Sequence, residues 1–480
     1  MALPRTLRPI ITICGATGVG KSKLAVELAL NLAKRFDTHG WKGGVVVNAD
    51  SMQVYKGFNT ITNKIPFGER EGVDHVLMGI KEPTEQYVVG QWVHDATQAI
   101  NDAHLSKKVP VVVGGTAYYI QHLAFPGRLA VEPEQVTDSL SPPPPTRPPP
   151  SDMLLSALSQ ITPDMRELFD ALPEIPPSAA EEPGAALSLY NLLHALDPDV
   201  ASRWHWRDTR KVLRNLQIMR DTGKRVSDIF KAQSSMTPAP KYDTLCFWLY
   251  AEPEELRRRL DIRTDAMLQD NLLDDVRELR SLMLPSKDSS AYFTAGVYQS
   301  IGFREFHKYL SDPSPSEKKY QVAVEEMKTA NHQYAKRQTS WIRNKLVPAV
   351  QASKAAEGGR RAEVYLLDTT EPGEWTSAVR DLAISLMEAF LNCEPLPDPL
   401  TLSSAAKTML SVPERATDPT AVLLARRKII CPVCTKDESQ PVMIEQGREW
   451  DAHARSKVHK YLLAKCVGNR HVSATGSGTG

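Results

Sequence analysis

The segment GATGVGKS, which begins at residue 15, has the residue types and spacing of a loop that wraps around phosphate groups. Its glycines let backbone N–H groups turn toward phosphate oxygens, Lys21 adds a point charge, and the Ser22 hydroxyl can ligate Mg²⁺. The pattern indicates a di- or triphosphate ligand and carries no information about a nucleobase. The candidate phosphate-binding residues are Gly15, Ala16, Thr17, Gly18, Val19, Gly20, Lys21 and Ser22.

A second candidate is Asp50, which ends the apolar run GGVVVNAD. Ligands of open α/β sheets bind at the carboxyl ends of the strands, so this carboxylate could hold Mg²⁺ or act as a general base. A turn or helix-capping aspartate is the alternative. Gln53 and Tyr55 follow closely, and their side chains suit hydrogen bonding to a base or stacking on it, which favours a functional role.

Near the other end of the chain, Cys431, Cys434, His453 and His459 form the pattern C-x2-C-x18-H-x5-H. Two thiolates and two imidazoles suit tetrahedral Zn²⁺, and we expect both histidines on the closing helix or its frayed end. Four protein ligands would make the zinc structural rather than catalytic. The alternative is two unrelated reduced cysteines.

Composition limits the possible partners and compartments. The 480 residues carry a net charge of +1, so a nucleic-acid partner would have to be held by a local basic patch. No apolar run approaches the roughly 18 residues that span a bilayer, so we expect no membrane partner. The six cysteines include only one close pair, which favours a reducing compartment. We expect a cytoplasmic monomer, with mitochondria or the nucleus as further locations.

The elements that must position these residues are buried apolar strands alternating with helices. This alternation predicts an α/β fold with a P-loop-type parallel sheet, helices on both faces, a helical insertion and a small zinc finger at the carboxyl terminus. Leu24, Leu28 and Leu32 lie at helical spacing after the glycine loop. Long amphipathic helices are expected over residues 254–284 and 316–344. Strands are expected at residues 10–14, 109–113, 244–250 and 362–368, and before Asp50.

The strand pattern stops near residue 126 and a proline-rich run follows at residues 141–151, which cannot join a sheet. We therefore expect several domains. The expected division is residues 1–125 and 236–393 for the two parts of a catalytic core, 126–235 for a helical insertion with a proline-rich loop, 394–425 for a linker, 426–466 for the finger and 467–480 for a disordered tail.

Several segments together resemble the tRNA dimethylallyltransferase family, also called tRNA isopentenyltransferases. They are GATGVGKS, NADSMQVYKG and GGTAYYI, followed in the family's order by WRDTRKVLRNLQ, RRLDIRTDAML, GVYQSIGFREF and YAKRQTSWIRNK. The resemblance covers about residues 9–125 and 190–345, and the finger is typical of the eukaryotic branch. It implies a P-loop-type core with a helical insertion that grips tRNA.

The resemblance also implies a reaction. A dimethylallyl group would pass from dimethylallyl diphosphate to N6 of adenosine at tRNA position 37, beside the anticodon, and diphosphate would leave. Asp50 matches the family's catalytic base, and Thr116 matches a threonine near the reacting amine. Arg263 matches the arginine that closes on the diphosphate, which the glycine loop would hold with Mg²⁺.

The family's tRNA-contacting stretches match segments on four parts of the chain. In YAKRQTSWIRNK, cations alternate with an aromatic residue, a combination that can contact phosphates and stack on bases. The candidate tRNA-binding residues are Ser51, Met52, Gln53, Arg210, Lys211, Arg214, Gln299, Gly302, Arg304, Lys336, Arg337, Gln338, Trp341 and Arg343. They would hold the anticodon stem-loop and the flipped adenine.

Two other functions fit part of the pattern. A P-loop kinase or NTPase acting on RNA or nucleotides explains the glycine loop and Asp50, but not the later segments. A non-catalytic RNA-binding adaptor explains the finger, but a decayed site would not be expected to keep the residues that this one retains, which are Lys21, Ser22, Asp50 and Arg263.

Overall fold

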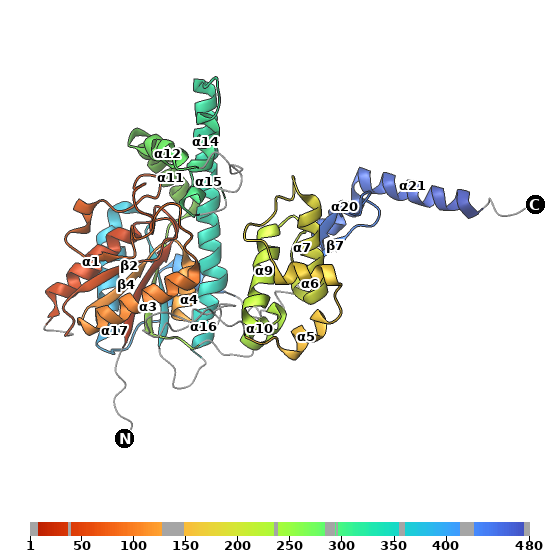
Figure 1. Cartoon of the computed structure of the whole chain (residues 1–480). Helices are drawn as coiled ribbons and strands as arrows, with labels where there is room; N and C mark the ends of the chain where they lie inside the picture. Colours follow the sequence, from red (N-terminus) through yellow and green to blue (C-terminus); the bar gives the residue numbers. More distant parts are fainter. Residues whose placement is uncertain are drawn as a thin grey trace, which may run out of the picture. The chain divides into compact units, whose positions relative to one another are not determined.

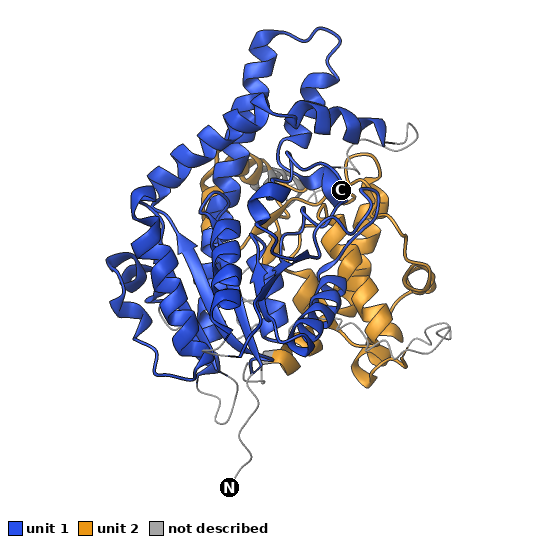
Figure 2. Ribbon diagram, turned by 90° about the vertical axis from the view of Figure 1, so that its left-hand side faces the viewer, with its two compact units in different colours: residues 1–129, 237–415 blue, residues 130–236, 416–480 orange. Residues whose placement is uncertain are grey.

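The structure, a computed structural model, describes residues 8–36, 40–126, 148–234, 239–283, 293, 296–354, 361–412 and 427–474. The chain divides into two compact units, each built from two separate stretches (Figure 2). Unit 1 comprises Met1–Leu129 and Thr237–Arg415, and unit 2 comprises Ala130–Met236 and Ala416–Gly480. The division expected from the sequence is finer than this one and stays a prediction.

A six-stranded sheet forms the centre of unit 1, with the strand order β3-β2-β4-β1-β5-β6 (Figure 1). All neighbouring strands are parallel, so the expected parallel sheet is confirmed. The two-residue strand β3 was not expected, because so short a strand has no period to detect. The strands are β1 (Pro9–Gly15), β2 (Gly44–Asn48), β3 (His75–Val76), β4 (Val109–Val113), β5 (Asp243–Tyr250) and β6 (Ala362–Asp368).

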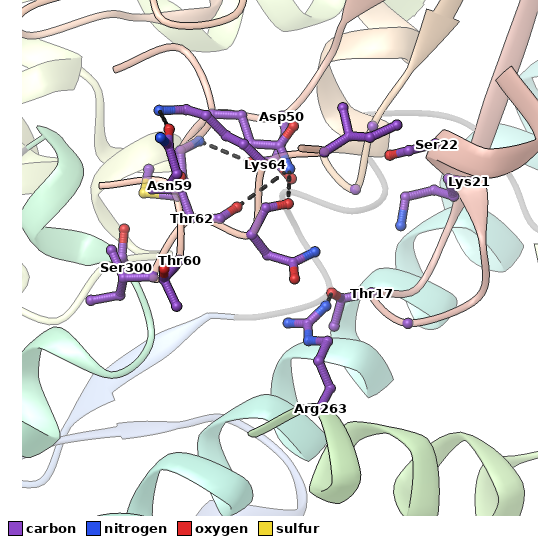
Figure 3. Close-up of a pocket in the computed structure, with 18 of the residues that line it drawn as sticks. Thr17, Lys21, Ser22, Asp50, Asn59, Thr60, Thr62, Lys64, Arg263 and Ser300 are labelled. Carbon is purple, nitrogen blue, oxygen red and sulfur yellow. Dashed lines mark hydrogen bonds between the residues drawn. The ribbon is translucent and has the colours of Figure 1, made fainter. Parts of the chain in front are cut away.

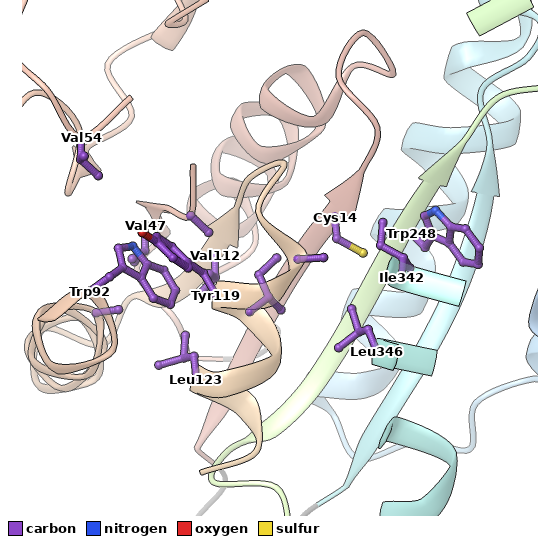
Figure 4. Packing of buried hydrophobic residues seen from close by; sticks show 14 of the residues in the cluster. Cys14, Val47, Val54, Trp92, Val112, Tyr119, Leu123, Trp248, Ile342 and Leu346 are labelled. Carbon is purple, nitrogen blue, oxygen red and sulfur yellow. The ribbon is translucent and has the colours of Figure 1, made fainter. Parts of the chain in front are cut away.

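Alternate residues of each central strand bury opposite faces of the sheet. Ile11 and Ile13 of β1 belong to the same buried cluster as Leu24 and Leu28 of helix α1 (Lys21–Lys34). Cys14 belongs to the cluster on the other face, where Trp92 of helix α3 (Val89–Leu105) stacks on Tyr119 with 4.8 Å between ring centroids (Figure 4). Because both faces are covered, the strands read as continuous apolar runs.

The expected helix over residues 254–284 is instead two helices, α11 (Pro253–Gln269) and α12 (Leu272–Ser281). The break lies at Asp270, whose carboxylate accepts a hydrogen bond from the Thr60 hydroxyl at 2.9 Å. Asp275 of α12 then accepts from the backbone amides of Thr60 and Ile61. The break therefore lets α12 fasten the loop that follows Asp50.

The long helix α15 (Glu317–Trp341) starts at Ser316, whose hydroxyl accepts a hydrogen bond from the Lys319 amide. Its amino-terminal part lies beside α14 (Phe303–Leu310) (Figure 1). Its last turn continues into a π-helical turn at Ile342–Leu346 and then α16 (Val347–Ser353). The other short elements of unit 1 are η1 (Phe67–Arg70), α4 (Ala117–Ala124), η2 (Gly296–Gln299), η4 (Pro372–Glu374), η5 (Trp375–Asp381), α17 (Leu382–Leu391), η6 (Pro399–Thr401) and α18 (Ser404–Leu410).

Part of the expected linker is ordered in unit 1. Helix α18 lies within residues 394–425, and its Ala406 and Leu410 are buried in the same cluster as β6. Pro397 also accepts a hydrogen bond from the Tyr365 hydroxyl at 2.6 Å. Two apolar residues at helical spacing are a weak signal in a segment rich in Pro, Ser and Thr.

Unit 2 contains the helical insertion, and a separate hydrophobic core supports it. Trp206 and Leu193 are completely buried in this core. Its helices are α5 (Asp152–Leu158), α6 (Pro163–Asp170), α7 (Pro183–Leu196), α8 (Pro198–Ala201), α9 (Thr209–Thr222) and α10 (Val226–Ser234).

The Cys/His module docks on the insertion within unit 2. The Trp206 indole donates to the Pro441 carbonyl at 2.8 Å, and the Lys428 amide donates to the Ser202 carbonyl at 2.6 Å. Met443 belongs to the insertion's core. The module consists of β7 (Lys428–Ile430), β8 (Met443–Glu445), α20 (Arg448–Arg455) and α21 (Lys457–Ala474). A module this small buries little apolar surface of its own, so it shares the core of its neighbour.

Among the described residues, no helix combines the length and apolarity that crossing a bilayer requires. Most of the expected proline-rich loop, the second half of the expected linker and the end of the expected tail fall outside the described residues.

Leu28 offers a test of the packing. It is completely buried between α1 and the sheet, so Leu28→Ala should lower the free energy of unfolding by about 2–5 kcal/mol. Leu105→Ala, at a side chain that is 85% exposed, is the matched control and should change it by less than about 0.5 kcal/mol. Urea denaturation followed by circular dichroism measures both, and equal midpoints would contradict the assigned packing.

Candidate functional site

The strand order brings three loops to one edge of the sheet. The glycine loop follows β1, Asp50 follows β2, and Gly114–Thr116 follow β4, which lies between those two strands. These loops line a cavity of about 1140 Å³ in unit 1, with α11 and α15 contributing further walls (Figure 3). The structure therefore brings together the candidate phosphate loop, Asp50 and Arg263, although Arg263 lies more than 200 residues from the other two in the sequence.

The glycine loop ends at Gly20, which has φ 87° and caps helix α1. This left-handed conformation favours glycine, and an added Cβ would lie 2.6 Å from the Trp375 ring. Lys21 donates to the Ala16 carbonyl at 2.7 Å, and the Ser22 side chain lies beside it (Figure 3). Burial lowers the pKa of the Lys21 ammonium to about 8, while the charge of Asp50 opposes this shift.

Arg263 approaches the same loop from α11 (Figure 3). One guanidinium nitrogen donates to the Thr17 hydroxyl. Its Nε is buried and has no hydrogen-bond partner among the residues that the structure describes. Burial also lowers the pKa of this guanidinium, although the charge of Asp50 acts against it. Two partly buried cations at one helix N-terminus could hold an anion with several negative charges.

Asp50 is held by the end of β2. Its carboxylate accepts from the Met52 amide at 2.9 Å, and its own amide donates to the Asn48 side chain at 3.2 Å. Asn48 in turn donates to the Leu77 carbonyl, and its carbonyl accepts from the Trp92 indole. This network points the carboxylate into the cavity that the glycine loop lines.

Thr116 occupies the N-cap position of α4 without capping it through its side chain. Its hydroxyl instead accepts from the Ser51 amide at 3.2 Å and lies 3.4 Å from the Ser51 hydroxyl. Thr116 and Asp50 are thus joined by one hydrogen-bonded turn. Met52 is partly buried against the core.

Tyr334 is a cavity residue that the sequence reasoning missed. Burial, and then the charge of Asp50, raise the pKa of its hydroxyl well above the usual value, so it remains a hydrogen-bond donor. Asn331 and Gln338 lie on the same face of α15 and also line the cavity. Polar residues at spacings of three and four on an otherwise apolar stripe were the signal that could have identified this face.

The loop after Asp50 forms another wall (Figure 3). Gln53 donates its amide to the carbonyls of Thr62 and Asn63, at 3.3 and 2.9 Å. Lys64, which was also not predicted from the sequence as a site residue, donates to the Tyr55 and Gly57 carbonyls. Burial lowers the pKa of its ammonium to about 8. Both side chains hold the loop closed on itself, and they line the cavity as well.

The candidate tRNA contacts of unit 1 fall into exposed and packed groups. Lys336 and Arg337 of α15 and Gln299 and Arg304 near α14 are exposed. Gly302 is buried, with φ 106° and an added Cβ 3.3 Å from Met327. Trp341 is partly buried, and its ring meets the Tyr118 ring edge-on. Arg343 is also partly buried and donates to the Thr408 carbonyl. Gln338 is buried.

The candidates of unit 2 form a basic face on α9. Arg210, Lys211 and Arg214 are exposed and lie at spacings of one, three and four residues. Lys211 lies over the Trp204 ring, 4.7 Å from its centroid. The partly exposed Trp204 thus adds an aromatic surface to the basic face.

The four predicted metal ligands of unit 2 come together, with their ligand atoms within 4.8 Å of one another. Zn–S bonds of about 2.3 Å and Zn–N bonds of about 2.0–2.1 Å in a tetrahedron predict separations of about 3.5 Å between sulfur and nitrogen. Cys431 Sγ lies 3.4 Å from His453 Nε2 and 3.5 Å from His459 Nδ1, and Cys434 Sγ lies 3.5 Å from His459 Nδ1. The cluster fits zinc.

The expectation that both histidines lie on the closing helix or its frayed end was wrong. His453 lies on α20 and His459 on α21, because Ser456 adopts an extended conformation between them. The Ser456 hydroxyl accepts from the His459 amide at 3.2 Å and so starts the second helix.

The pKa of Lys21 predicts pH-dependent anion binding. Since the ammonium must be protonated to attract an anion, the affinity for inorganic diphosphate should fall by up to about tenfold per pH unit above pH 8. Lys21→Arg, whose charge is permanent in this range, should show a flatter profile. Isothermal titration calorimetry between pH 7 and 9.5 measures both, and parallel profiles would refute a titrating Lys21.

Loss of the metal should loosen unit 2, because Pro441 and Met443 of the finger pack on the insertion. Cys431→Ser should abolish zinc binding and lower the melting temperature of the protein. Cys393→Ser, at an exposed free cysteine, is the matched control and should change neither. Elemental analysis and thermal scans measure the outcome, and zinc retained by the Cys431 variant would exclude this site.

Comparison with known proteins places these features in one family. A family model described as IPP transferase matches residues 53–345. The tRNA dimethylallyltransferase of Schizosaccharomyces pombe is 32% identical over 96% of both chains, and that of Saccharomyces cerevisiae is 32% identical over 95% of this chain and 92% of its own.

A solved structure agrees. A crystal structure described as a eukaryotic dimethylallyltransferase acting on tRNA aligns with a TM-score of 0.69 at 30% identity, over 97% of this chain and 99% of that one. Arg263 and the cavity residues of α15 lie in the region that the family model matches, whereas the glycine loop and Asp50 precede it and are covered by the relatives that align over most of the chain. The chain therefore belongs to the tRNA dimethylallyltransferase family of transferases.

Proposed function

We propose that the protein transfers the dimethylallyl group of dimethylallyl diphosphate to N6 of adenosine 37 of tRNA, next to the anticodon, and releases diphosphate. One observation carries the proposal. A single cavity has two partly buried cations, Lys21 and Arg263, and the N-terminus of α1 on one side, and the carboxylate of Asp50 on another. That arrangement suits an anionic leaving group and a nucleophile that must lose a proton.

The glycine loop, Lys21 and Arg263 would act on the leaving group. The C1–O bond of the prenyl diphosphate breaks, and negative charge accumulates on the departing oxygen. Donors fixed in advance stabilise that charge as it develops, and each is typically worth about 3 kcal/mol. Arg263 adds a planar fork that matches phosphate oxygens. The buried Nε of Arg263 has no hydrogen-bond partner among the described residues, so it can donate to the diphosphate.

Asp50 would act on the nucleophile. The N6–C1 bond forms while the amine loses a proton to the carboxylate, so the electron pair of the N–H bond stays on nitrogen. A positioned general base contributes about 10²–10⁴ in rate. The Met52 amide holds one carboxylate oxygen, and the Thr116–Ser51 turn lies beside it, so a hydroxyl is available to orient the adenine.

Mg²⁺ is the cofactor that the loop chemistry implies. The Ser22 hydroxyl lines the cavity beside Lys21, as a magnesium ligand would. When bound, the ion would neutralise charge on the diphosphate. The protein's own part is to present Ser22 at the first turn of α1 and to hold Lys21 against the Ala16 carbonyl.

The anticodon stem-loop of tRNA is the proposed RNA partner. Unit 1 offers the exposed Lys336 and Arg337 of α15, and unit 2 offers the basic face of α9 with Arg210 and Arg214. Contacts of this kind would position the RNA through its phosphates. An adenine in the loop must leave its stack to enter the cavity, at a cost of a few kcal/mol. Ser51 and Gln53 line that cavity.

The zinc ion is proposed to be structural. All four ligands of a tetrahedral site come from the protein, so no position remains for substrate. The exposed Lys457 and Lys460 follow on α21, and they make the finger a further candidate for RNA contact. The monomeric state and the cytoplasmic, mitochondrial or nuclear location stay predictions.

Asp50→Asn tests the proposed base, because it keeps the shape of the side chain and removes its basicity. We expect a loss of about 10²–10⁴ in the rate of prenyl transfer with little change in tRNA affinity. Asp102→Asn, at an exposed side chain of α3, is the control. Mass analysis of tRNA incubated with dimethylallyl diphosphate and Mg²⁺, beside filter binding, measures the two effects. Transfer at the wild-type rate by the Asp50→Asn variant would exclude Asp50 as the base.

The same assay separates the proposal from a kinase or NTPase. Incorporation of the prenyl group in the absence of ATP supports transfer. ATP hydrolysis stimulated by tRNA, without any gain in tRNA mass, would favour the alternative.

A further inference from the structure

Gln338 links two loops of the site through both ends of its amide. The side chain is 5% exposed and comes from the inner face of α15. Its oxygen accepts from the Thr17 amide at 2.9 Å, and its nitrogen donates to the Gly115 carbonyl at 2.9 Å. Both hydrogen-bonding groups are thus used within the protein.

The two loops carry different parts of the proposed chemistry. Thr17 belongs to the phosphate loop after β1, and its hydroxyl accepts from Arg263. Gly115 belongs to the turn after β4, and the next residue, Thr116, is hydrogen-bonded to the turn that contains Asp50 and Ser51. Since β1 and β4 are adjacent, these loops leave the sheet side by side, and Gln338 spans the gap between them.

The turn is shaped to receive this side chain. A Cβ at position 115 would lie 2.4 Å from the Gln338 nitrogen, closer than atoms can approach. The same Cβ would lie 3.4 Å from Asp50 Oδ2, so a side chain at position 115 would crowd both the Gln338 amide and the carboxylate. A glycine here admits the amide and leaves room beside Asp50.

We propose that Gln338 is a positioning residue that fixes the phosphate loop relative to the Thr116–Asp50 turn, and so fixes the leaving group relative to the acceptor. This proposal rests on the proposed function, because the groups that Gln338 positions are those assigned to prenyl transfer. A displacement of about 1 Å between reacting groups can lower a rate by about 10². Glutamine suits the role because one end accepts while the other donates, whereas an ionised glutamate only accepts.

Gln338→Glu gives this link a pH signature. The ionised carboxylate would repel the Gly115 carbonyl, and we expect kcat to fall by about 10² at pH 8 with an unchanged KM for tRNA. As the pH falls and the carboxyl protonates, its O–H can donate to Gly115, so the rate relative to wild type should recover. Gln338→Leu should lose a similar factor and show no recovery.

Gln333 provides the matched control, since it is an exposed glutamine on the same helix. Gln333→Glu and Gln333→Leu should keep wild-type kcat and pH profile. Melting temperatures within a few degrees of wild type would confirm that all four variants fold. A wild-type kcat for Gln338→Leu, a loss confined to the KM for tRNA, or a pH-independent loss in Gln338→Glu would each overturn the proposal.

A second readout does not depend on the reaction. In Gln338→Leu the Thr17 amide loses its acceptor, so hydrogen–deuterium exchange in peptides covering residues 15–22 and 114–116 should accelerate together, by about tenfold or more. Gln333→Leu should leave both unchanged. Exchange that stays at the wild-type rate would refute the link even if the protein catalyses another reaction. Faster exchange in Gln338→Leu, together with no prenyl transfer by the wild-type protein, would support the link and refute the proposed function.

Discussion

The placement of two cations inside one cavity is the constraint on which the site depends. Lys21 and Arg263 are both partly buried, and the charge of Arg263 adds to the burial that lowers the pKa of Lys21. Removing a charge from water is unfavourable unless it is paired, so the fold must supply compensation. Asp50 supplies part of it from the neighbouring loop, and the carbonyl of Ala16 supplies another part. The remainder is the binding energy available to a polyvalent anion.

The order of the strands sets the separation between the candidate phosphate loop and Asp50. Because β4 lies between β1 and β2, the Gly114–Thr116 turn separates the phosphate loop from Asp50. Helix α15 covers this edge and presents two surfaces. Its inner face carries Tyr334 and Gln338 into the cavity, Arg337 lies exposed at the cavity, and Lys336 is exposed to solvent outside it. One amphipathic helix thus serves both the chemistry and a candidate RNA surface.

Unit 2 shows how a small metal module can gain a core. Trp206 of the insertion is completely buried, and its indole is satisfied by the Pro441 carbonyl of the finger. Met443 adds apolar contact. The Cys/His cluster fixes the finger's fold, and these contacts fix the finger on the insertion, so α9 and α21 belong to one unit. These contacts explain why loss of the metal should also destabilise the insertion.

The sequence by itself determined the chemistry-bearing groups and the local elements. Gly15–Ser22, the C-x2-C and H-x5-H patterns and the apolar strands all depend on short spacings, and local spacing is readable without a structure. The break at Asp270 and the second helix after Ser456 were not predicted. The side chains of Asp270 and Ser456 accept hydrogen bonds at these points, and neither residue belongs to the apolar periodicity from which the helices were predicted.

Only the tertiary structure decided which groups meet. Thr17, Gly115 and Gln338 are far apart in the chain, and no spacing rule connects them. The order of the strands and the burial of one face of α15 place them within hydrogen-bonding distance. The lowered pKa of Lys21 arises in the same way, because burial and neighbouring charges are properties of the assembled fold and not of the loop that carries the residue.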